Sequence, residues 1–493
     1  MDNAGKLSKV LLELWGSVAK IEEAALSKSK EANLSVIEIH TLEAIGEGKG
    51  KTMTHTAALL KISVSTLTAA INKLVAKGYV NRVRIPEDRR IVMIELTAKG
   101  TLAVKEHEAF RLSMINSALS RISEEEATEL IRSLDNVNDF MTLRRIHCDI
   151  NNERPITPDM IYQGGMGIGV SMSRLAAAVA VCGGVGVISA TEPGYDEPGY
   201  KKNPLEANKR VLDRNIKDAL DIVKKSGGKG LIGVNILSSS KHYEEYVTTA
   251  VNAGAQAIIS GGGIPTALPG ICKGRAVLLI PVVSSARAAS VIIRNWTKKY
   301  DRVPDAVIFE SSMAGGNLGF KEEQLGNAQE TFYKSIVEIK NELAGFPGCK
   351  LIVAGGIYSR QDAGMVIACG ADGIQLGSRF VTTFECDAPI EFKQAYLNLN
   401  ETGVTTIKGL GSRADRVINN KFAKRIQKGP VPIRSCDGCI VTCDGKEAPF
   451  CFKEALITSV SGDTENGLMY CGGNAWKADK IETVKEVFDY FTL

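Results

Sequence analysis

The chain has 493 residues, of which 44% are hydrophobic and 24% charged, and its net charge is +4 at neutral pH. The composition is typical of a globular protein, and the length exceeds one ordinary core, so we expect two or three domains. No apolar run is long enough to cross a bilayer and the N-terminus lacks a signal-peptide pattern, which predicts a cytoplasmic protein without a membrane partner. Eleven cysteines, an odd number, favour reduced thiols or a metal site over a disulfide scaffold.

Residues 1–147 predict an all-α, winged-helix domain. Apolar residues recur at helical spacing in 11–18 and 34–45, and Thr54 and Ser63 are placed to cap two short helices, the second of which ends at Gly78. A hairpin, 79–96, follows. Positions 49–90 hold nine lysines and arginines against two acidic residues, whereas residues 1–147 carry a balance of only +2. This concentration favours a phosphate-contacting helix–turn–helix and wing, with a solvated basic face as the alternative.

The exposed face of the second short helix and the wing tip carry side chains that can reach bases or phosphates. The predicted DNA-binding residues are Ser65, Thr66, Thr68, Asn72, Lys73, Arg89 and Arg90. The segment 52–100 resembles the DNA-binding core of MarR-family transcriptional regulators, including the Asp-Arg-Arg wing tip and the Leu-Thr-x-x-Gly exit. The resemblance implies a homodimer built by the first and last helices, the latter at 102–120 and 124–143. It also implies a palindromic double-stranded operator, with Arg90 in the minor groove.

A second domain is predicted at 159–430, after a polar linker at 148–158. Its apolar runs alternate with amphipathic helices, and strands buried on both faces are near-continuously apolar, so the pattern predicts an α/β (β/α)8 TIM barrel. A doubly wound sheet is the alternative. The eight runs are 160–163, 185–190, 231–237, 257–260, 277–283, 306–309, 350–354 and 373–376.

Two strand-to-loop transitions near the end of this domain carry glycine. Gly355-Gly356 and the segment 373–378 follow the pattern of the last two barrel loops, in which bare backbone and helix N-termini bind a phosphate. Glycines that serve only as turns are the alternative. The segment 163–169 has its glycines in the wrong register for a dinucleotide fingerprint and better suits a flat isoalloxazine ring, to which Asn235 can hydrogen-bond.

In order along the chain, the motifs QGGMGIG, GVNIL, SGGGIP, PVVSS, AGGNLG, AGGI and QLGSRF resemble an FMN-dependent barrel family. This family contains nitronate monooxygenase and the flavin-type enoyl-ACP reductase. The resemblance covers roughly 156–385 and implies FMN, NAD(P)H as co-substrate, and a small-molecule or acyl-thioester substrate. It assigns FMN binding to Gly164, Gly165, Met166, Asn235, Gly355, Gly356, Gln375, Gly377 and Ser378.

Asn317 stands where that family has the histidine of Ala-Gly-Gly-His, its proposed acid–base group. An amide donates and accepts hydrogen bonds but takes no proton near pH 7, which excludes nitroalkane deprotonation by this residue. We therefore favour reduction of an activated C=C bond, which needs a proton donor only late. His242, the only histidine of the barrel, follows the third strand, and we hypothesise that it replaces the missing imidazole. A surface histidine is the alternative.

Residues 431–493 predict a Cys-rich C-terminal extension. Cys436, Cys439, Cys443 and Cys451 are spaced closely enough to enclose one metal centre, with Cys471 as a fifth candidate. The C-x2-C-x3-C start is similar to the cluster-binding segment of 2,4-dienoyl-CoA reductases, which implies a 4Fe–4S cluster. Zinc and reduced packing thiols are the alternatives.

Together these patterns predict a multi-domain fusion of a MarR-type regulator with an FMN-dependent oxidoreductase. One alternative is a repressor that senses flavin or an acyl ligand through a non-catalytic barrel, and another is an iron–sulfur flavoprotein for electron transfer or quinone reduction. The fusion suggests the hypothesis that flavin redox state or a bound acyl substrate biases the DNA-binding dimer. Covalent linkage alone, however, creates no differential affinity.

Overall fold

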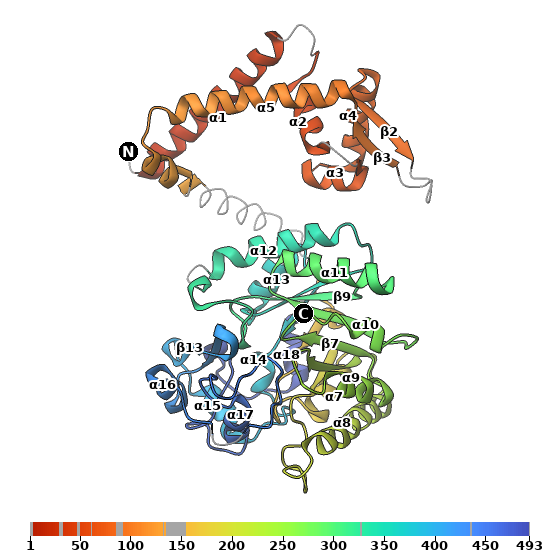
Figure 1. Ribbon diagram of the computed structural model, residues 1–493, viewed down its shortest axis with the longest axis vertical. Helices are drawn as coiled ribbons and strands as arrows, with labels where there is room; N and C mark the ends of the chain where they lie inside the picture. The colour runs from red at the N-terminus through yellow and green to blue at the C-terminus, as the bar shows by residue number, and fades with distance from the viewer. Residues whose placement is uncertain are drawn as a thin grey trace. The chain divides into compact units, whose positions relative to one another are not determined.

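The computed structural model describes residues 3–28, 33–46, 50–60, 62–84, 92–131, 133–134, 154–325, 328–433 and 436–492. The chain divides into two compact units, Met1–Asn136 and Val137–Leu493, and each is described by itself (Figure 1). Within the described ranges, every helix is too short or too polar to span a lipid bilayer.

The first unit combines helices with a small antiparallel sheet. Its elements are α1 (Asn3–Lys28), α2 (Val36–Ile45), β1 (Lys51–Thr52), α3 (Met53–Leu60), α4 (Val64–Ala76), β2 (Val80–Arg84), β3 (Val92–Leu96) and α5 (Ala98–Leu119). The strand order β1-β3-β2 contains the predicted hairpin. Leu42, Leu67, Ile71, Leu74 and Ile94 form its core and expose no surface. The predicted winged-helix architecture is confirmed.

Side-chain caps fix where several of these helices begin. Ser63 accepts a hydrogen bond from the backbone N–H of Thr66 at 3.1 Å, as predicted for the start of α4. The predicted cap Thr54 lies inside α3, because Thr52 accepts the bond from the backbone N–H of His55 at 3.2 Å. The predicted helix at 124–143 is helical from 124 to 131, and its residues beyond 134 lie outside the described ranges.

Eight parallel strands of the second unit close into a barrel, in the order β11-β12-β4-β5-β6-β7-β8-β9. The predicted TIM barrel is thus confirmed, and the predicted strand ends agree with the observed ones to within one residue. The strands are β4 (Ile161–Gln163), β5 (Val185–Ser189), β6 (Leu231–Leu237), β7 (Ala257–Gly261), β8 (Leu278–Val283), β9 (Ala306–Glu310), β11 (Lys350–Ala354) and β12 (Gly373–Leu376).

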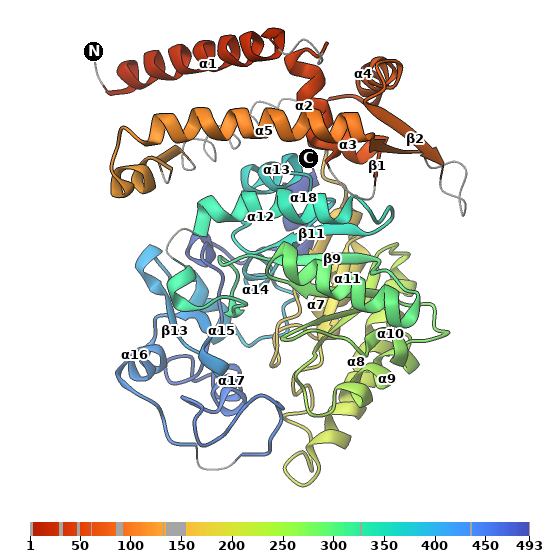
Figure 2. The same cartoon turned by 45° about the horizontal axis from the view of Figure 1, so that its top comes forward.

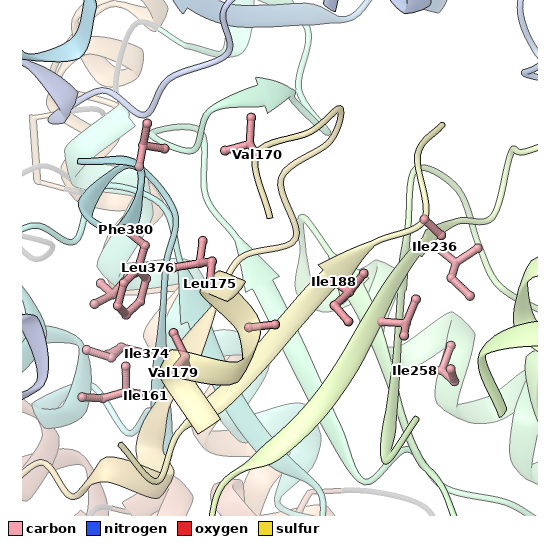
Figure 3. Packing of buried hydrophobic residues seen from close by; sticks show 14 of the residues in the cluster. Ile161, Val170, Leu175, Val179, Ile188, Ile236, Ile258, Ile374, Leu376 and Phe380 are labelled. Atoms are coloured by element: carbon pink, nitrogen blue, oxygen red, sulfur yellow. The ribbon is translucent and has the colours of Figure 1, made fainter. Parts of the chain in front are cut away.

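Helices cover the outside of the barrel. They are α7 (Ser173–Val181), α8 (Pro204–Ser226), α9 (Tyr243–Asn252), α10 (Leu268–Ile271), α11 (Ala286–Tyr300), α12 (Ala328–Leu343), α13 (Arg360–Ala368) and α14 (Ser378–Val381). Figure 3 shows Val179 of α7 beside Ile161 and Ile374, and Leu175 beside Leu376. Burial of such side chains stabilises each by about 1.5–3 kcal/mol relative to exposure, which holds the helices on the strands.

The strands separate two cores, because their side chains alternate between two faces. Ile188, Val234 and Ile258 point toward the helices and belong to the large outer cluster. Val187 and Ile308 belong to a second cluster that fills the barrel interior. Two residues beyond an interior position, the next inward-facing side chain lies near the carboxyl end of its strand.

The predicted extension is not a separate module. Phe450, Leu456, Phe488 and Phe491 are buried in the same cluster as the outer face of the barrel. Figures 1 and 2 place α17 of the extension together with β13, α15 and α16, which precede residue 431, on one side of the barrel. The further elements are η1 (Pro158–Met160), β10 (Gly316–Asn317), η2 (Glu322–Gln324), α15 (Ile390–Leu397), η3 (Glu401–Gly403), β13 (Val404–Lys408), η4 (Leu410–Ser412), β14 (Ala414–Ile418), α16 (Lys421–Lys428), α17 (Phe452–Val460), η5 (Ala475–Lys477) and α18 (Val484–Thr492).

Two glycines provide a matched test of the α7–β5 contact. A Cβ on Gly186 of β5 would overlap the backbone carbonyl of Ala176, whereas a Cβ on Gly364 of α13 would meet nothing within 4 Å. We expect Gly186→Ala to lower the free energy of unfolding by about 1–3 kcal/mol through overpacking. Gly364→Ala should raise it by about 0.5–1 kcal/mol, because alanine favours a helix.

The measurement is urea unfolding of the full chain, followed by tryptophan fluorescence. Trp296 is buried in the barrel unit and reports its unfolding. Equal unfolding midpoints for the two variants would contradict the predicted contact.

Candidate functional site

A cavity of about 600 Å³ lies at the carboxyl ends of the barrel strands. Its size is in the range of small-molecule and cofactor sites, about 300–1,000 Å³. All nine residues predicted to bind FMN line it, from Gly164 on β4's loop to Ser378 at the start of α14. Residues from the barrel and from the C-terminal extension therefore enclose one common site.

Inward-facing residues near the carboxyl ends of several strands supply part of the cavity wall. Val187 fills the interior, and Ser189, two residues later, lines the cavity. Asn235, which lies within β6, reaches the cavity in the same way. Strand periodicity thus places these polar side chains on the floor of the cavity.

Glycine is required at two of the predicted cofactor positions. A Cβ on Gly165 would overlap the side chain of Asn235. Gly355 has φ +90°, and a Cβ there would lie 2.6 Å from the backbone nitrogen of Ala314. The backbone therefore borders the cavity without side chains at both places, as a flat ring and a phosphate require.

The segment 471–474 of the extension packs directly against the predicted phosphate loops. The backbone N–H of Gly472 donates to Ser378 Oγ at 2.8 Å, and Asn474 Nδ2 donates to the carbonyl of Gly356 at 2.6 Å. The sequence prediction missed these residues. The Gly-Gly pair after the apolar run 468–471 was the available signal.

Asn317 is fixed by a buried carboxylate that the sequence prediction also missed. Asn317 Nδ2 donates to Asp415 Oδ1 at 3.0 Å, and the Tyr470 hydroxyl donates to Asp415 Oδ2 at 3.0 Å. β10 pairs with β14 and brings Asn317 opposite Asp415. Burial raises the pKa of Asp415 to about 6, although both hydrogen bonds act to lower it.

Glu310 ends β9 and lines the cavity, one residue beyond the strand end that the sequence predicted. Burial raises the pKa of its carboxyl to about 7. Among the described residues that line the cavity, Glu310 is the only acidic residue, and none is a histidine or a lysine. The sequence carried no separate signal for this residue, because it reads as the polar end of an apolar run.

His242 does not line the cavity. It precedes α9, where its Nδ1 lies 3.3 Å from Glu245 Oε1 and its ring packs against Tyr246 at a centroid distance of 6.5 Å. The hypothesis that it replaces the missing imidazole is therefore not supported by its position. The loop after β6 begins at the carboxyl end of the barrel, but His242 lies at the far end of this loop, where α9 begins.

The predicted metal ligands do not form a metal-binding shell in this structure. Among the described residues, no three His, Cys, Asp or Glu side chains gather as such a site requires. Cys436 is exposed, and Cys439, Cys443 and Cys451 are partly buried, with the pKa of Cys439 raised to about 12 by burial. Cys471 lines the cavity, and none of the other four cysteines does so among the described residues.

The cysteine loop, residues 436–451, instead forms part of the cavity wall. The backbone N–H of Lys241 donates to the carbonyl of Cys439 at 3.0 Å, and that of Val441 donates to Ser239 at 2.8 Å. These bonds fasten the loop to the segment after β6. Ile440 and Thr442 then face the cavity.

The predicted DNA-binding residues of α4 share one exposed helix surface. Ser65, Thr66, Asn72 and Lys73 are exposed, whereas Thr68 is partly buried and donates to the carbonyl of Val64 at 2.7 Å. Asn72 Oδ1 accepts a bond from Arg82 Nη2 at 2.6 Å, which ties α4 to the wing strand β2. Arg89 and Arg90 lie outside the described residues.

The nitronate monooxygenase family model matches residues 153–492, which include the barrel and the extension. The chain belongs to the nitronate monooxygenase family. The model of the SarA/Rot transcriptional regulators matches residues 25–107 in the winged-helix unit. The chain therefore joins an oxidoreductase domain of this family to a regulator domain of the SarA and MarR type.

Similar proteins span most of the second unit. A probable nitronate monooxygenase of Staphylococcus aureus (strain Newman) is 22% identical over 343 residues, which are 67% of this chain and 95% of that protein. The structure of FabK from Thermotoga maritima covers 70% of this chain and 94% of its own, with a TM-score of 0.50 and 22% identity. Nitroalkane oxidase from Streptomyces ansochromogenes covers 68% and 95%, with a TM-score of 0.52 and 17% identity. The two structures confirm the fold.

The pKa of Asp415 predicts a pH effect on stability. Its folded value of about 6 exceeds its ordinary value of 3.8, so the folded state binds the proton more tightly. Asp415 therefore favours folding below pH 4, and this contribution is lost as pH rises to 6. About two pH units between the two pKa values correspond to about 3 kcal/mol.

The test compares free energies of unfolding of wild type and Asp415→Asn between pH 4 and 7. The advantage of wild type over the variant should fall by up to ~3 kcal/mol across this interval. Asp218→Asn, on the exposed face of α8, is the control and should parallel wild type. A difference between wild type and Asp415→Asn that does not change with pH would contradict the raised pKa.

Proposed function

We propose that the barrel unit is an FMN-dependent NAD(P)H oxidoreductase that reduces an activated C=C bond. The observation that carries this proposal is the convergence of all nine predicted flavin residues on one cavity. Gly355, Gly356, Gly377 and Ser378 would hold the phosphate, and Gly164–Met166 with Asn235 would border the ring. The cofactor, when bound, supplies hydride transfer.

Asn317 supports reduction over nitroalkane oxidation. Its amide cannot take the proton that a nitroalkane must lose, and its Nδ2 is already bonded to Asp415. Reduction of a C=C bond instead consumes a proton. The proton donor for this reaction can therefore be a residue other than Asn317.

The cavity wall suits an acyl thioester. Val381, Phe392, Leu456 and Val460 give it an apolar side that an acyl chain can occupy. Arg413 is the only lysine or arginine among the lining residues, and its guanidinium has no ion pair or hydrogen bond within the described part of the chain. A ligand with an apolar acyl chain and an anionic carrier group fits the apolar side and Arg413 together.

The first unit would bind double-stranded DNA as a homodimer. Val10, Leu14, Leu102, Leu112 and Ile115 are exposed apolar side chains along α1 and α5. Such residues in number mark a protein–protein contact. This surface lies on the helices that the MarR resemblance assigns to the dimer.

A ligand-sensing repressor with a non-catalytic barrel is the second candidate, and the replacement of the family histidine by Asn317 favours it. An iron–sulfur electron-transfer protein has less support, because no three potential ligands among the described residues are placed to hold a metal ion. Consumption of NAD(P)H by the FMN-loaded protein in the presence of an enoyl thioester decides between enzyme and sensor. Absorption beyond the flavin bands in an anaerobic visible spectrum would support the iron–sulfur alternative.

Asn317→His should introduce nitroalkane oxidation. Asp415 lies 3.0 Å from the amide of Asn317 and is positioned to orient an imidazole placed there. A positioned general base contributes about 10²–10⁴-fold, so we expect a gain of at least ~100-fold over wild type. Steady-state oxidation of a nitroalkane by the FMN-loaded variants measures it.

Asn317→Gln is the matched control, because it keeps an amide. If the histidine variant is no faster than the glutamine variant, proton transfer at position 317 does not limit this activity.

Lys73→Ala should weaken DNA binding and its salt dependence. Each lost phosphate contact lowers the slope of log affinity against log salt by about 1. Fluorescence anisotropy with a mixed-sequence duplex over a range of salt concentrations measures both quantities. Lys298→Ala, on an exposed face of α11 in the barrel unit, should leave them unchanged. If log affinity falls with log salt at the same slope in wild type and Lys73→Ala, Lys73 does not contact a DNA phosphate.

A further inference from the structure

Glu310 is placed in the cavity by the register of β9. Ala306 and Ile308 point into the barrel interior, while Val307 and Phe309 point toward the surrounding helices. Glu310 continues the inward series and lines the cavity. Across the sheet, its Cα partner on β11 is Ala354, which also lines the cavity and offers no polar side chain.

The carboxyl of Glu310 has no counterpart in the protein. Within the described residues, it forms no ion pair and no hydrogen bond, although Arg413 lines the same cavity. Buried carboxyls usually have such partners, and one that lacks them favours its protonated form. Burial accordingly raises its pKa to about 7, where it can both hold and release a proton in neutral solution.

The other titratable groups facing the cavity are less suited to proton transfer near pH 7. They are Arg413, Tyr358, Tyr396, Tyr470 and Cys471. Burial raises the pKa of Cys471 to about 12 and the pKa values of the three tyrosines above their ordinary value. Arg413 keeps its proton.

Asp415 is the nearest alternative, but it is committed elsewhere. It does not line the cavity, and its two oxygens accept bonds from Asn317 and Tyr470. The hydroxyl of Tyr470 donates to this carboxylate, so it has no second proton to give to a ligand. Glu310 remains as the group whose proton faces the reaction space.

We propose that Glu310 is the catalytic acid of the barrel. This inference rests on the function proposed above. In the reduction of an enoyl thioester, the flavin, when bound, would supply the hydride that the β carbon gains. The proton on a Glu310 oxygen forms the C–H bond at the α carbon, and the C=C π bond is lost. Glu310 is left as a carboxylate and regains its proton from water.

The experiment compares Glu310→Gln with wild type, using full-length protein loaded with FMN. Glutamine keeps the shape of the side chain but has no acidic proton. Glu310→Asp retains the acid and serves as the conservative variant, and Glu338→Gln, on the exposed face of α12, is the control. FMN binding by each variant is measured first and confirms an intact cavity.

Anaerobic stopped-flow kinetics separate the two half-reactions. Reduction of the flavin by NAD(P)H should be unchanged in Glu310→Gln, whereas its reoxidation by crotonyl-CoA should be at least ~100-fold slower. In wild type, the reoxidation rate should fall as pH rises through about 7, because the acid form is lost. The variant should show no such fall, and Glu310→Asp should recover part of the rate.

A second measurement does not depend on turnover. Infrared difference spectra of the protein should show a protonated carboxyl that titrates near pH 7 in wild type and in Glu338→Gln, and that is missing from Glu310→Gln. Unchanged reoxidation rate and pH profile in Glu310→Gln would overturn the proposal. If wild type does not turn over crotonyl-CoA, the proposed function fails, and the infrared titration alone then decides: no titrating carboxyl overturns the assignment.

Discussion

The alternation of side chains around the closed barrel is the constraint on which the rest of the second unit depends. Each strand directs one set of residues to the covering helices and the other set to the interior. Ile308 fills the interior core, and the next inward residue, Glu310, meets the cavity because the core ends below it. On β5, Val187 fills the interior core in the same way, and Ser189, two residues later, lines the cavity. Apolar packing beneath the site thus positions its polar groups.

The extension completes the site from the opposite side. Its aromatic residues share the outer core of the barrel, so the segment 471–474 is held against the predicted phosphate loops by burial as well as by hydrogen bonds. Arg416 of β14, which precedes the extension, supports the same region by donating to the carbonyls of Ser312 and Ala314 in the loop before Asn317. The extension is therefore a structural part of the cavity, in agreement with a family match that continues to residue 492.

The sequence predicted the barrel well because its strands are short apolar runs that alternate with amphipathic helices, which is a local signal. It also predicted nine residues that meet at one cavity, since residues after parallel strands share one end of a barrel. It missed Asp415 because β10, the strand that pairs Asn317 with it, has only two residues and no periodicity. The metal site and the role of His242 were predicted from spacing along the chain. Such spacing does not determine the direction in which a side chain points.

Two buried carboxyls near the cavity show how environment separates their roles. Both have raised pKa values because both are buried, yet Asp415 accepts two hydrogen bonds and Glu310 accepts none within the described residues. Bonds from Asn317 and Tyr470 stabilise the charged form of Asp415, which suits a residue that holds others in place. A carboxyl without such donors favours its protonated form, as the raised pKa of Glu310 indicates. The exchange of histidine for asparagine at 317 is therefore compatible with catalysis, because the acid that the reaction needs can stand on another strand.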